Sequence, residues 1–395
     1  MAISPPAWAL TRLIAGHICL HGAMAGTRMA APLMALKQGY SPLYVGCLLA
    51  LFSLMQVFLA IPAGRYADRH GLRRPVGLAL CFAVTGGLLA TLWPRFEVLC
   101  ISALCTGGAT GAASIALQRH VGRAAGDATE LKRVFSWLAI GPAVSNFLGP
   151  VAAGLLIDHA GVWFGGVAAD TTGFRSAFLL MAVLPLLTWF WIRTTRELPP
   201  VEHPPGQPRP QVWGLLREPA MRRLLLVNWL LSSCWDVHTF VVPVLGHERA
   251  FSASVIGAIL GSFAMASACI RVLMPMLASY LREWVVVSGA MLTTALLFAV
   301  YPLMHSPWTM GLCSVLLGLA LGSVQPMIMS TLHQITPHAL HGQALGLRLM
   351  SINLSSVLMP MLFGTAGAVV GVSVVFWTVG AAVGLGARAA WRMRP

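Results

Sequence analysis

Charged side chains are scarce in this sequence, and acidic ones are the rarest. Asp, Glu, Lys and Arg make up only 10% of the 395 residues, with 12 acids against 26 Lys and Arg. Soluble domains usually carry about 25% charged residues. Hydrophobic residues account for 57% of the chain, and its mean hydropathy is +0.77. This composition excludes an ordinary soluble protein and indicates a chain that folds in a lipid bilayer.

The sequence also lacks the motifs of several functional classes. Its eight cysteines lie in apolar segments without a CxxC pair, so we expect reduced packing residues rather than a disulfide or zinc framework. No phosphate-binding P-loop is present, which excludes a self-contained ATP-driven pump. No nucleophile with a neighbouring base, no metal cluster and no soluble signalling domain appears. A membrane enzyme or a non-transporting sensor is therefore a remote alternative, and neither a cofactor nor a catalytic residue is expected.

Apolar runs of about 20 residues recur along the whole chain, and each is long enough to cross a hydrocarbon core of about 30 Å. The first run is too long for the core of a signal peptide, so we expect it to be retained. The sequence predicts an all-α membrane protein. Its twelve expected helices span residues 8–36, 42–63, 75–93, 95–118, 134–157, 174–193, 222–246, 252–279, 284–304, 307–331, 345–368 and 370–390.

Basic residues mark the predicted topology. If the N-terminus is cytoplasmic, 20 of the 26 Lys and Arg fall in cytoplasmic segments, 4 fall outside, and Arg28 and Arg271 lie within helices. By the positive-inside rule, this asymmetry places both termini in the cytoplasm. The net charge of +14 therefore records topology and does not indicate a nucleic-acid partner. We expect a multi-pass protein of a bacterial-type inner (plasma) membrane.

The two halves of the chain repeat each other. At an offset of 211 residues, five positions of the first helix pair match: Pro32, Ser41, Gly46, Leu49 and Phe52 with Pro243, Ser252, Gly257, Leu260 and Phe263. At an offset of 210, Ser145, Leu148, Pro150 and Gly154 match Ser355, Leu358, Pro360 and Gly364. Such duplicated six-helix units are typical of alternating-access transporters, whose site lies near the bilayer midplane between the halves. The predicted organisation is an N-terminal bundle (1–193), a proline-rich cytoplasmic linker (194–219) and a C-terminal bundle (220–395).

The segment after the second predicted helix carries the most specific motif. It reads Gly64-Arg65-Tyr66-Ala67-Asp68-Arg69-His70-Gly71-Leu72-Arg73-Arg74 and matches the pattern G-x-x-x-D-R/K-x-G-x-R/K-R/K at every defined position. Glycines allow a tight turn at the membrane face, and arginines hold the segment in the cytoplasm. This string resembles the signature loop of the major facilitator superfamily, and in particular that of its bacterial drug and metabolite:proton antiporters.

The resemblance implies twelve transmembrane helices in two pseudo-symmetric six-helix bundles. It also implies a monomer in the lipid bilayer that carries a small-molecule substrate and protons. In that family the Asp and Arg of the loop latch the halves together in the outward-facing state, which gives Asp68 and Arg69 a gating role. The expected gating residues are Gly64, Asp68, Arg69, Gly71, Arg73 and Arg74. The second half departs from the pattern at residues 278–283, so the resemblance does not extend to a matching latch there.

The fifth predicted helix contains a second, partial motif. Its segment Gly149-Pro150-Val151-Ala152-Ala153-Gly154 resembles the G-P-x-x-G-G core of the superfamily's antiporter motif, with Ala153 in place of one glycine. The upstream glycines are replaced by Ser136 and Ser145. Small residues allow close packing, and Pro150 allows a bend. The motif favours an exporter, and the alternative is a plain packing kink.

Charges inside the predicted spans are few. A charged side chain at a helix centre costs roughly 2.5–3.5 kcal/mol on insertion scales, so each one is a functional candidate. Asp236, in the middle of the seventh predicted helix, is the only acid well inside a span. Arg28 lies in the outer half of the first helix. Arg271 lies toward the cytoplasmic end of the eighth, where it could snorkel to the interface.

Polar residues at helical spacing form one stripe in each half, as expected if both halves line one cavity. The first stripe comprises His17, His21 and Arg28. The second comprises Asn228, Ser232, Asp236 and Thr239, and is bordered by Trp235, which could stack on a substrate. His238 falls about 200° away from Asp236 at 100° per residue and is expected to be a packing or interfacial histidine.

These stripes suggest a coupling mechanism. Asp236 would take up and release the driving proton, and Arg28 would attract an anionic group of the substrate. His21 would lie between them as a polar relay or a ligand. The alternative is that Asp236 and Arg28 form only a structural ion pair. His17 and His21 have the spacing of a metal-binding pair, but no third ligand accompanies them, so no metal site is predicted.

Gln325 and Asn353, in the tenth and eleventh predicted helices, are weaker candidates for substrate contacts, and each could instead make a helix-packing hydrogen bond. The hypothesis from sequence is a transporter, driven by the proton gradient, that exports an organic small molecule. An importer of an anionic metabolite or a metal chelate is the alternative, because it would use the same parts in the other direction.

Overall fold

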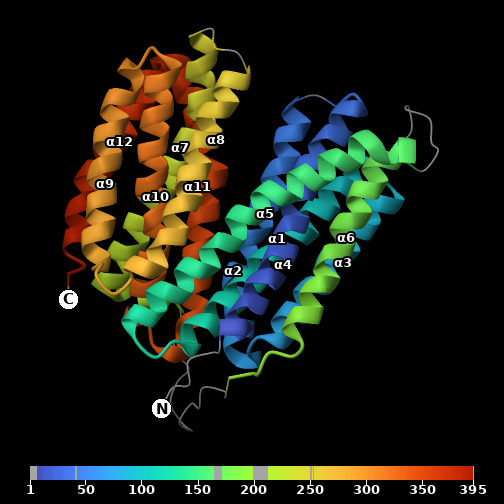
Figure 1. The fold of residues 1–395 in the computed structure, drawn as a ribbon, viewed down its shortest axis with the longest axis horizontal. Helices are drawn as coiled ribbons and strands as arrows, with labels where there is room; N and C mark the ends of the chain where they lie inside the picture. Colours follow the sequence, from blue (N-terminus) through green and yellow to red (C-terminus); the bar gives the residue numbers. More distant parts are fainter. Residues whose placement is uncertain are drawn as a thin grey trace. The chain divides into compact units, whose positions relative to one another are not determined.

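Twelve long helices make up this computed structural model, as the sequence predicted (Figure 1). The structure describes residues 7–40, 42–163, 171–198, 212–249, 251 and 253–394, and no strand occurs among them. The helices are α1 (Ala7–Lys37), α2 (Pro42–His70), α3 (Arg73–Leu92), α4 (Phe96–Ala124), α5 (Ala128–Trp163), α6 (Thr172–Ile192), α7 (Pro219–Glu248), α8 (Ala253–Leu277), α9 (Glu283–Val300), α10 (Pro307–Ile335), α11 (His341–Val370) and α12 (Val372–Trp391). Short 3-10 helices occur at η1 (Val212–Arg217), η2 (Tyr301–Leu303) and η3 (His338–Leu340).

Nine of the helices in the described residues are long and apolar enough to cross a membrane. The three others are α1, α7 and α11, which are 31, 30 and 30 residues long. The two polar stripes predicted from sequence lie on α1 and α7, and Asn353 lies on α11. Most of the candidate transport residues therefore lie on these three helices, and Gln325 lies on α10.

The signature segment is mostly helix rather than loop, which corrects the prediction. α2 continues to His70, and only Gly71 and Leu72 separate it from α3. Gly71 has a φ of 75°, the left-handed conformation that favours glycine. An apolar run marks only the part of a helix that lies in hydrocarbon, so the sequence pattern predicts a loop where the polar end of α2 continues as helix. Of the predicted linker, residues 199–211 lie outside the described residues.

The chain divides into two compact units. Unit 1 consists of Met1–Ala124, Ile140–Arg209 and His338–Met350, and unit 2 consists of Ala125–Ala139, Pro210–Pro337 and Ser351–Pro395. The start of α5 thus belongs to unit 2 and the start of α11 to unit 1. The bundle boundaries predicted from sequence remain a prediction.

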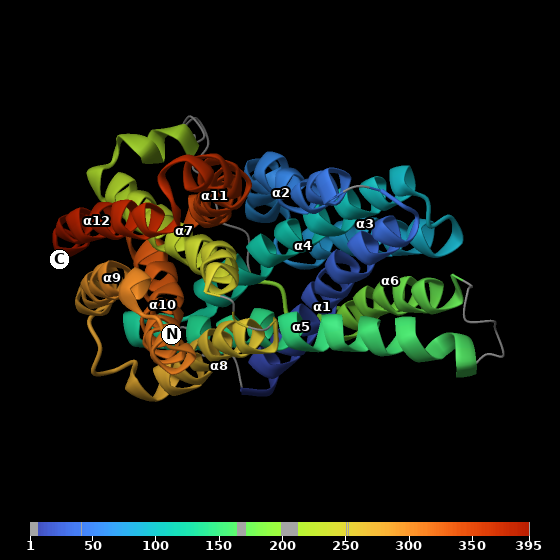
Figure 2. The ribbon, with the colours of Figure 1, turned by 90° about the horizontal axis from the view of Figure 1, so that it is seen from above.

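The same helix-packing scheme occurs in each unit. In unit 1, α4 packs against α2 and α3, and α6 packs against α1 and α3. In unit 2, α10 packs against α8 and α9, and α12 packs against α7 and α9. Each of these four contacts in unit 1 therefore has a counterpart in unit 2, six helices along the chain. Within unit 1, α1 lies between α4 and α5 (Figure 2).

Closely packed glycines show that the predicted repeat is also structural. Gly107 of α4 lies directly against the backbone of Phe52 in α2, and Gly318 of α10 lies against the backbone of Phe263 in α8. Both pairs obey the offset of 211 residues, since Phe52 and Phe263 were matched by sequence. Small residues allow such close approach of helices in membranes. The repeat is therefore confirmed at the level of individual contacts.

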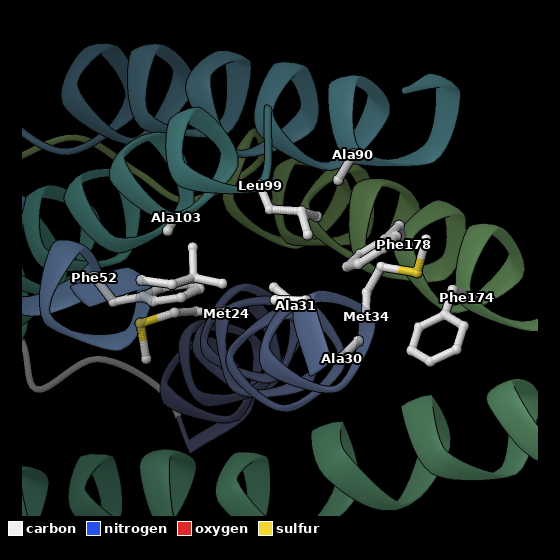
Figure 3. Packing of buried hydrophobic residues seen from close by; sticks show 12 residues of the cluster. Met24, Ala30, Ala31, Met34, Phe52, Ala90, Leu99, Ala103, Phe174 and Phe178 are labelled. Carbon is white, nitrogen blue, oxygen red and sulfur yellow. The ribbon is translucent and has the colours of Figure 1, made fainter. Parts of the chain in front are cut away.

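The largest described core cluster of unit 1 gathers around α1 (Figure 3). Met24 and Met34 of α1 pack with Phe52 of α2 and with Phe178 of α6 in one buried cluster. Alanines at positions 30 and 31 leave room for these aromatic rings, and both are fully buried. This packing fixes α1, and with it the first polar stripe, within unit 1.

Substituting Gly318 with Ala is expected to lower the melting temperature of the purified protein. A Cβ at Gly318 would overlap the carbonyl oxygen of Phe263 and lie 3.0 Å from the Cβ of Ala266. Overpacking of this kind typically costs about 1–3 kcal/mol. Gly311→Ala on the same helix is the matched control, because a Cβ there would meet nothing within 4 Å. Equal melting temperatures for the two variants would show that the α8–α10 contact is not close-packed.

Candidate functional site

The carboxylate of Asp68, at the end of α2, collects three donors. Its Oδ1 accepts hydrogen bonds from Nε of Arg119 at 2.6 Å and from the backbone N–H of Gly342 at 2.9 Å. Its Oδ2 accepts one from the backbone N–H of Gln343 at 3.0 Å. Gly342 and Gln343 belong to the first turn of α11, whose N–H groups have no partner within the helix. A carboxylate therefore caps the positive end of a helix and also pairs with a guanidinium.

All these groups belong to unit 1, and they are almost completely buried. The side chains of Arg119 and Asp68 are only 3% and 7% exposed. Arg69, to which the sequence assigned the latch together with Asp68, is exposed, and the cation beside Asp68 is Arg119 of α4. Breaking a buried pair leaves an uncompensated charge, which makes this cluster sensitive to the loss of either partner.

Glycines allow α2 to reach the first turns of α11. The carbonyl oxygens of Gly64 and Ala60 lie directly against Gly342 and Gly346, respectively. A Cβ at Gly342 would also lie 2.8 Å from Oδ1 of Asp68. The first glycine of the signature motif therefore serves helix packing, and only Gly71 serves a turn.

The remaining signature residues organise the start of α3. The carboxylate of Glu197 accepts hydrogen bonds from the backbone N–H groups of Leu72 at 3.0 Å and Arg73 at 2.6 Å. Nε of Arg73 donates to the carbonyl oxygen of Thr195 at 3.0 Å. Arg74 is exposed. Thr195 and Glu197, which follow α6, are thus hydrogen-bonded to Leu72 and Arg73 at the start of α3.

Unit 2 contains a different ionic cluster where the second half departs from the signature pattern. Nζ of Lys132, in the first turns of α5, donates to the carbonyl oxygen of Leu281 at 2.8 Å and lies 3.8 Å from the carboxylate of Glu283. Glu283 also accepts hydrogen bonds from Ser330 at 3.0 Å and from Gln334 at 2.9 Å. At the 210-residue offset, Lys132 corresponds to Gly342. In unit 2 the ammonium group of Lys132 faces an acid, Glu283, as the backbone N–H groups of Gly342 and Gln343 face Asp68 in unit 1.

On α1, the first polar stripe runs from the buried His17 through the half-buried His21 to the exposed Arg28. Nε2 of His17 lies 3.1 Å from the hydroxyl of Ser114 in α4, and its ring makes an edge contact with His21 at 5.9 Å between centroids. The Nδ1 atoms of both rings are buried without a hydrogen-bond partner in the described part of the chain. Arg28 is exposed in unit 1. No group of three or more His, Cys, Asp or Glu that could hold a metal occurs in the described ranges.

The antiporter-like segment of α5 packs against α1. A Cβ at Gly149 would lie 2.5 Å from the carbonyl oxygen of Gly22, and one at Gly154 would lie 3.4 Å from Cε of Met29. Ser145 donates a hydrogen bond to the carbonyl oxygen of Ile18 at 3.0 Å. Pro150 lies inside the helix, which continues to Trp163. The small residues of this motif let two helices approach at backbone distance.

On α7, Asp236 meets two serines of α11. Its carboxylate accepts hydrogen bonds from Ser355 at 3.3 Å and from Ser356 at 3.4 Å. The hydroxyl of Ser355 also lies 3.1 Å from that of Ser233. All four residues belong to unit 2. This acid is held by neutral hydroxyl donors on a neighbouring helix.

The other residues of the second stripe surround Asp236 in sequence but have different settings. Asn228 and Asn353 are buried, Ser232 and Gln325 are half-buried, and Thr239 is exposed and donates to the carbonyl oxygen of Trp235 at 3.0 Å. His238 is fully buried, and its Nε2 lies 3.0 Å from the hydroxyl of Ser314. His238 is therefore the packing histidine that its helical angle predicted. The candidates on α1 belong to unit 1, and those on α7, α10 and α11 belong to unit 2.

The sequence pattern does not single out Arg119, Glu197, Lys132 and Glu283. Arg119 and Lys132 enter only the count of basic residues, and the two glutamates belong to no motif. Their role depends on partners 51 to 151 residues away, which no local pattern reveals. Arg348, also counted as a cytoplasmic charge, is only 2% exposed. An available signal is that Arg119 and Lys132 lie within a few residues of a helix end, where a buried cation can pair with an acid.

Sequence and fold comparisons agree on the kind of protein that this chain resembles. Residues 13–279 match the sequence model of the Major Facilitator Superfamily, and residues 224–395 match it a second time. The chain is 26% identical over 361 residues to the multidrug resistance protein MdtG of Dickeya zeae (strain Ech586), covering 86% of this chain and 83% of that protein. It is 30% identical over 156 residues to the class B tetracycline resistance protein of Escherichia coli, covering 39% and 36%.

The fold is also similar to that of a solved transporter. A bacterial homologue of the iron transporter ferroportin, in the outward-facing state, superposes with a TM-score of 0.78 at 16% identity, covering 98% of this chain and 99% of that one. At this identity the likeness establishes the fold alone. The sequence model and the fold together match the twelve-helix architecture expected from the apolar runs.

Proposed function

Because this chain belongs to the major facilitator superfamily, we propose that it is a proton-coupled transporter that exports an organic small molecule by alternating access. The observation that carries the proposal is Asp236, an acid near the middle of α7 held by Ser355 and Ser356. An ionisable residue within a membrane helix is costly and marks a proton or substrate path by default. We assign the binding and release of the driving proton to the carboxylate of Asp236.

Export is the direction that the relatives favour. MdtG is a multidrug resistance protein, and the second relative is a tetracycline resistance protein. A membrane transporter confers resistance when it removes the compound from the cell. The segment of α5 that resembles the antiporter motif packs Gly149 closely against Gly22 of α1. We assign substrate contacts to the stripes of α1 and α7 and to Gln325 and Asn353, with His21 as a relay.

Gating is assigned to the Asp68 cluster. Asp68 accepts hydrogen bonds from Arg119 and from the first N–H groups of α11. If α11 moves relative to α2 during the transport cycle, these bonds can form in only one of its states. The Lys132 cluster of unit 2 would play the same part with a different donor. We further propose a monomer in a bacterial-type inner membrane with both termini in the cytoplasm, on the basis of the basic residues.

An importer of an anionic metabolite or a metal chelate is the second candidate, because arginines lie within α1 and α8. Accumulation assays separate the two directions. In a bacterial host without its own drug exporters, energised cells that express the exporter should accumulate less of a transported antibiotic, and a protonophore should remove the difference. Higher accumulation in expressing cells would favour import.

A further inference from the structure

Arg271 of α8 has no counter-charge among the described residues of unit 2. Its guanidinium lies over the ring of Trp235, with 5.6 Å from Cζ to the ring centroid. Its Nε atom is buried without an acceptor. No hydrogen bond or carboxylate partner of Arg271 occurs within the described ranges of the chain. An arginine within a membrane helix normally pairs with an acid or a carbonyl oxygen. The guanidinium of Arg271 therefore has N–H donors that could bind an anion.

The guanidinium lies at the depth of the middle of α7 rather than at the cytoplasmic interface. Trp235 is close to the centre of α7, which runs from Pro219 to Glu248, so it lies about 24 Å along the helix from its first residue. Side chains on a helix lean toward its N-terminus, which directs Arg271 away from the near end of α8 at Leu277. The snorkelling expected from sequence is therefore not observed.

The aromatic partner of Arg271 is held rigidly. The ring of Trp235 makes an edge contact with Phe263 at 4.6 Å between centroids, and Phe263 stacks on His238 at 4.1 Å. His238 is fixed by Ser314, whose hydroxyl also lies 2.8 Å from that of Tyr301. A guanidinium and an indole held in this way form a binding surface that a ligand does not have to order.

We propose that Arg271 and Trp235 form the recognition site for an organic anion, with a carboxylate for the guanidinium and a planar unsaturated body for the indole. The guanidinium presents a planar fork of N–H donors that matches a carboxylate, and aromatic rings stack on flat apolar groups. The inference rests on the proposed function, since it names the substrate class of that transporter, and the site takes the same anion in either direction of transport. A lipid phosphate is a second source of negative charge, but headgroups lie at the interface and not at the height of Trp235.

Calorimetric titration of the purified full chain with naphthoate tests the inference, and naphthamide is the uncharged control ligand. Naphthoate is expected to bind at least about tenfold more tightly than naphthamide. Arg271→Met should remove that preference, and Arg271→Lys should retain part of it, because an ammonium keeps the charge without the planar fork. Arg282→Met, which removes an exposed arginine from the turn before α9, is the matched control and should bind naphthoate like the unmodified protein.

A structural role for Arg271 predicts a different pattern. If it were only a packing cation, Arg271→Met would lower the melting temperature, whereas removal of an unpaired guanidinium should leave it unchanged or raise it. Equal binding of naphthoate and naphthamide, or unchanged naphthoate binding by Arg271→Met, would overturn the inference. So would Arg271-dependent stabilisation by phosphatidylglycerol vesicles in place of naphthoate. Binding at Arg271 without proton-driven transport would instead contradict only the proposed function.

Discussion

Replacing Asp236 with Asn is expected to abolish transport driven by a proton gradient while leaving downhill exchange of the substrate intact. The amide has almost the same size and keeps an oxygen for Ser355 and Ser356, which lie 3.3 and 3.4 Å from the carboxylate. It cannot bind and release a proton near neutral pH. The variant should therefore fold and bind substrate, and only the coupling should be lost. Uptake into liposomes with and without a pH gradient measures both activities.

Ser356→Ala is the matched control for Asp236→Asn. It removes one neutral donor at 3.4 Å but keeps the carboxylate and the second serine. A single neutral hydrogen bond is worth only about 0.5–1.5 kcal/mol. Gradient-driven transport should therefore survive in this variant, at a reduced rate. If Asp236→Asn retained full gradient-driven transport, the coupling role of Asp236 would be refuted.

Replacing Asp68 with Asn is expected to reduce the transport rate at least about tenfold and to lower the melting temperature. The substitution leaves Arg119 buried without its counter-charge and weakens the cap on the first turn of α11. Removing one partner of a buried pair typically costs about 3–5 kcal/mol. Transport assays and thermal unfolding of the purified variant measure the two effects. Glu97→Gln, at an exposed acid of α4, is the matched control and should change neither.

A double variant separates the ion pair from its surroundings. Asp68→Asn combined with Arg119→Met removes both charges, so it should be more stable than the sum of the single losses predicts, by about 0.5–3 kcal/mol. Lys132→Met in unit 2 should have a smaller effect, because Glu283 keeps its bonds from Ser330 and Gln334 and the ion pair is longer, at 3.8 Å. Strict additivity of the two single losses of stability would contradict an energetic coupling between Asp68 and Arg119.

The fold was predictable because the bilayer imposes it. Each backbone group must be bonded within the membrane, so an apolar run of about 20 residues becomes a helix, and twelve runs became twelve helices. The repeat is also visible in the sequence, where Phe52 and Phe263 match at an offset of 211 residues, and in the structure Gly107 and Gly318 pack against these two residues. The ends of helices were less predictable, because α2 continues through polar residues that an apolar pattern does not register.

The candidate site was predictable only in part. Asp68, Asp236 and the α1 stripe can be selected as candidates from the sequence, because a signature string or an isolated polar residue marks them in the chain. The partners of these residues were not found, since Arg119 and Ser355 come from other helices and only packing brings them close. The sequence marks Arg271 as a charge within a helix, but it does not show where the side chain points. The contact of its guanidinium with Trp235 shows that it points toward the middle of α7.

The central claim is that proton entry drives the export of an organic small molecule, and the direction of gradient-driven uptake tests it most directly. Purified protein in liposomes should accumulate a substrate when the lumen is more acidic than the bath, because protons leaving the lumen drive the substrate inward. A protonophore should abolish the accumulation, and liposomes that contain the Asp236→Asn variant should not accumulate the substrate. Accumulation only with an alkaline lumen would mean that proton and substrate move together, which would contradict the account.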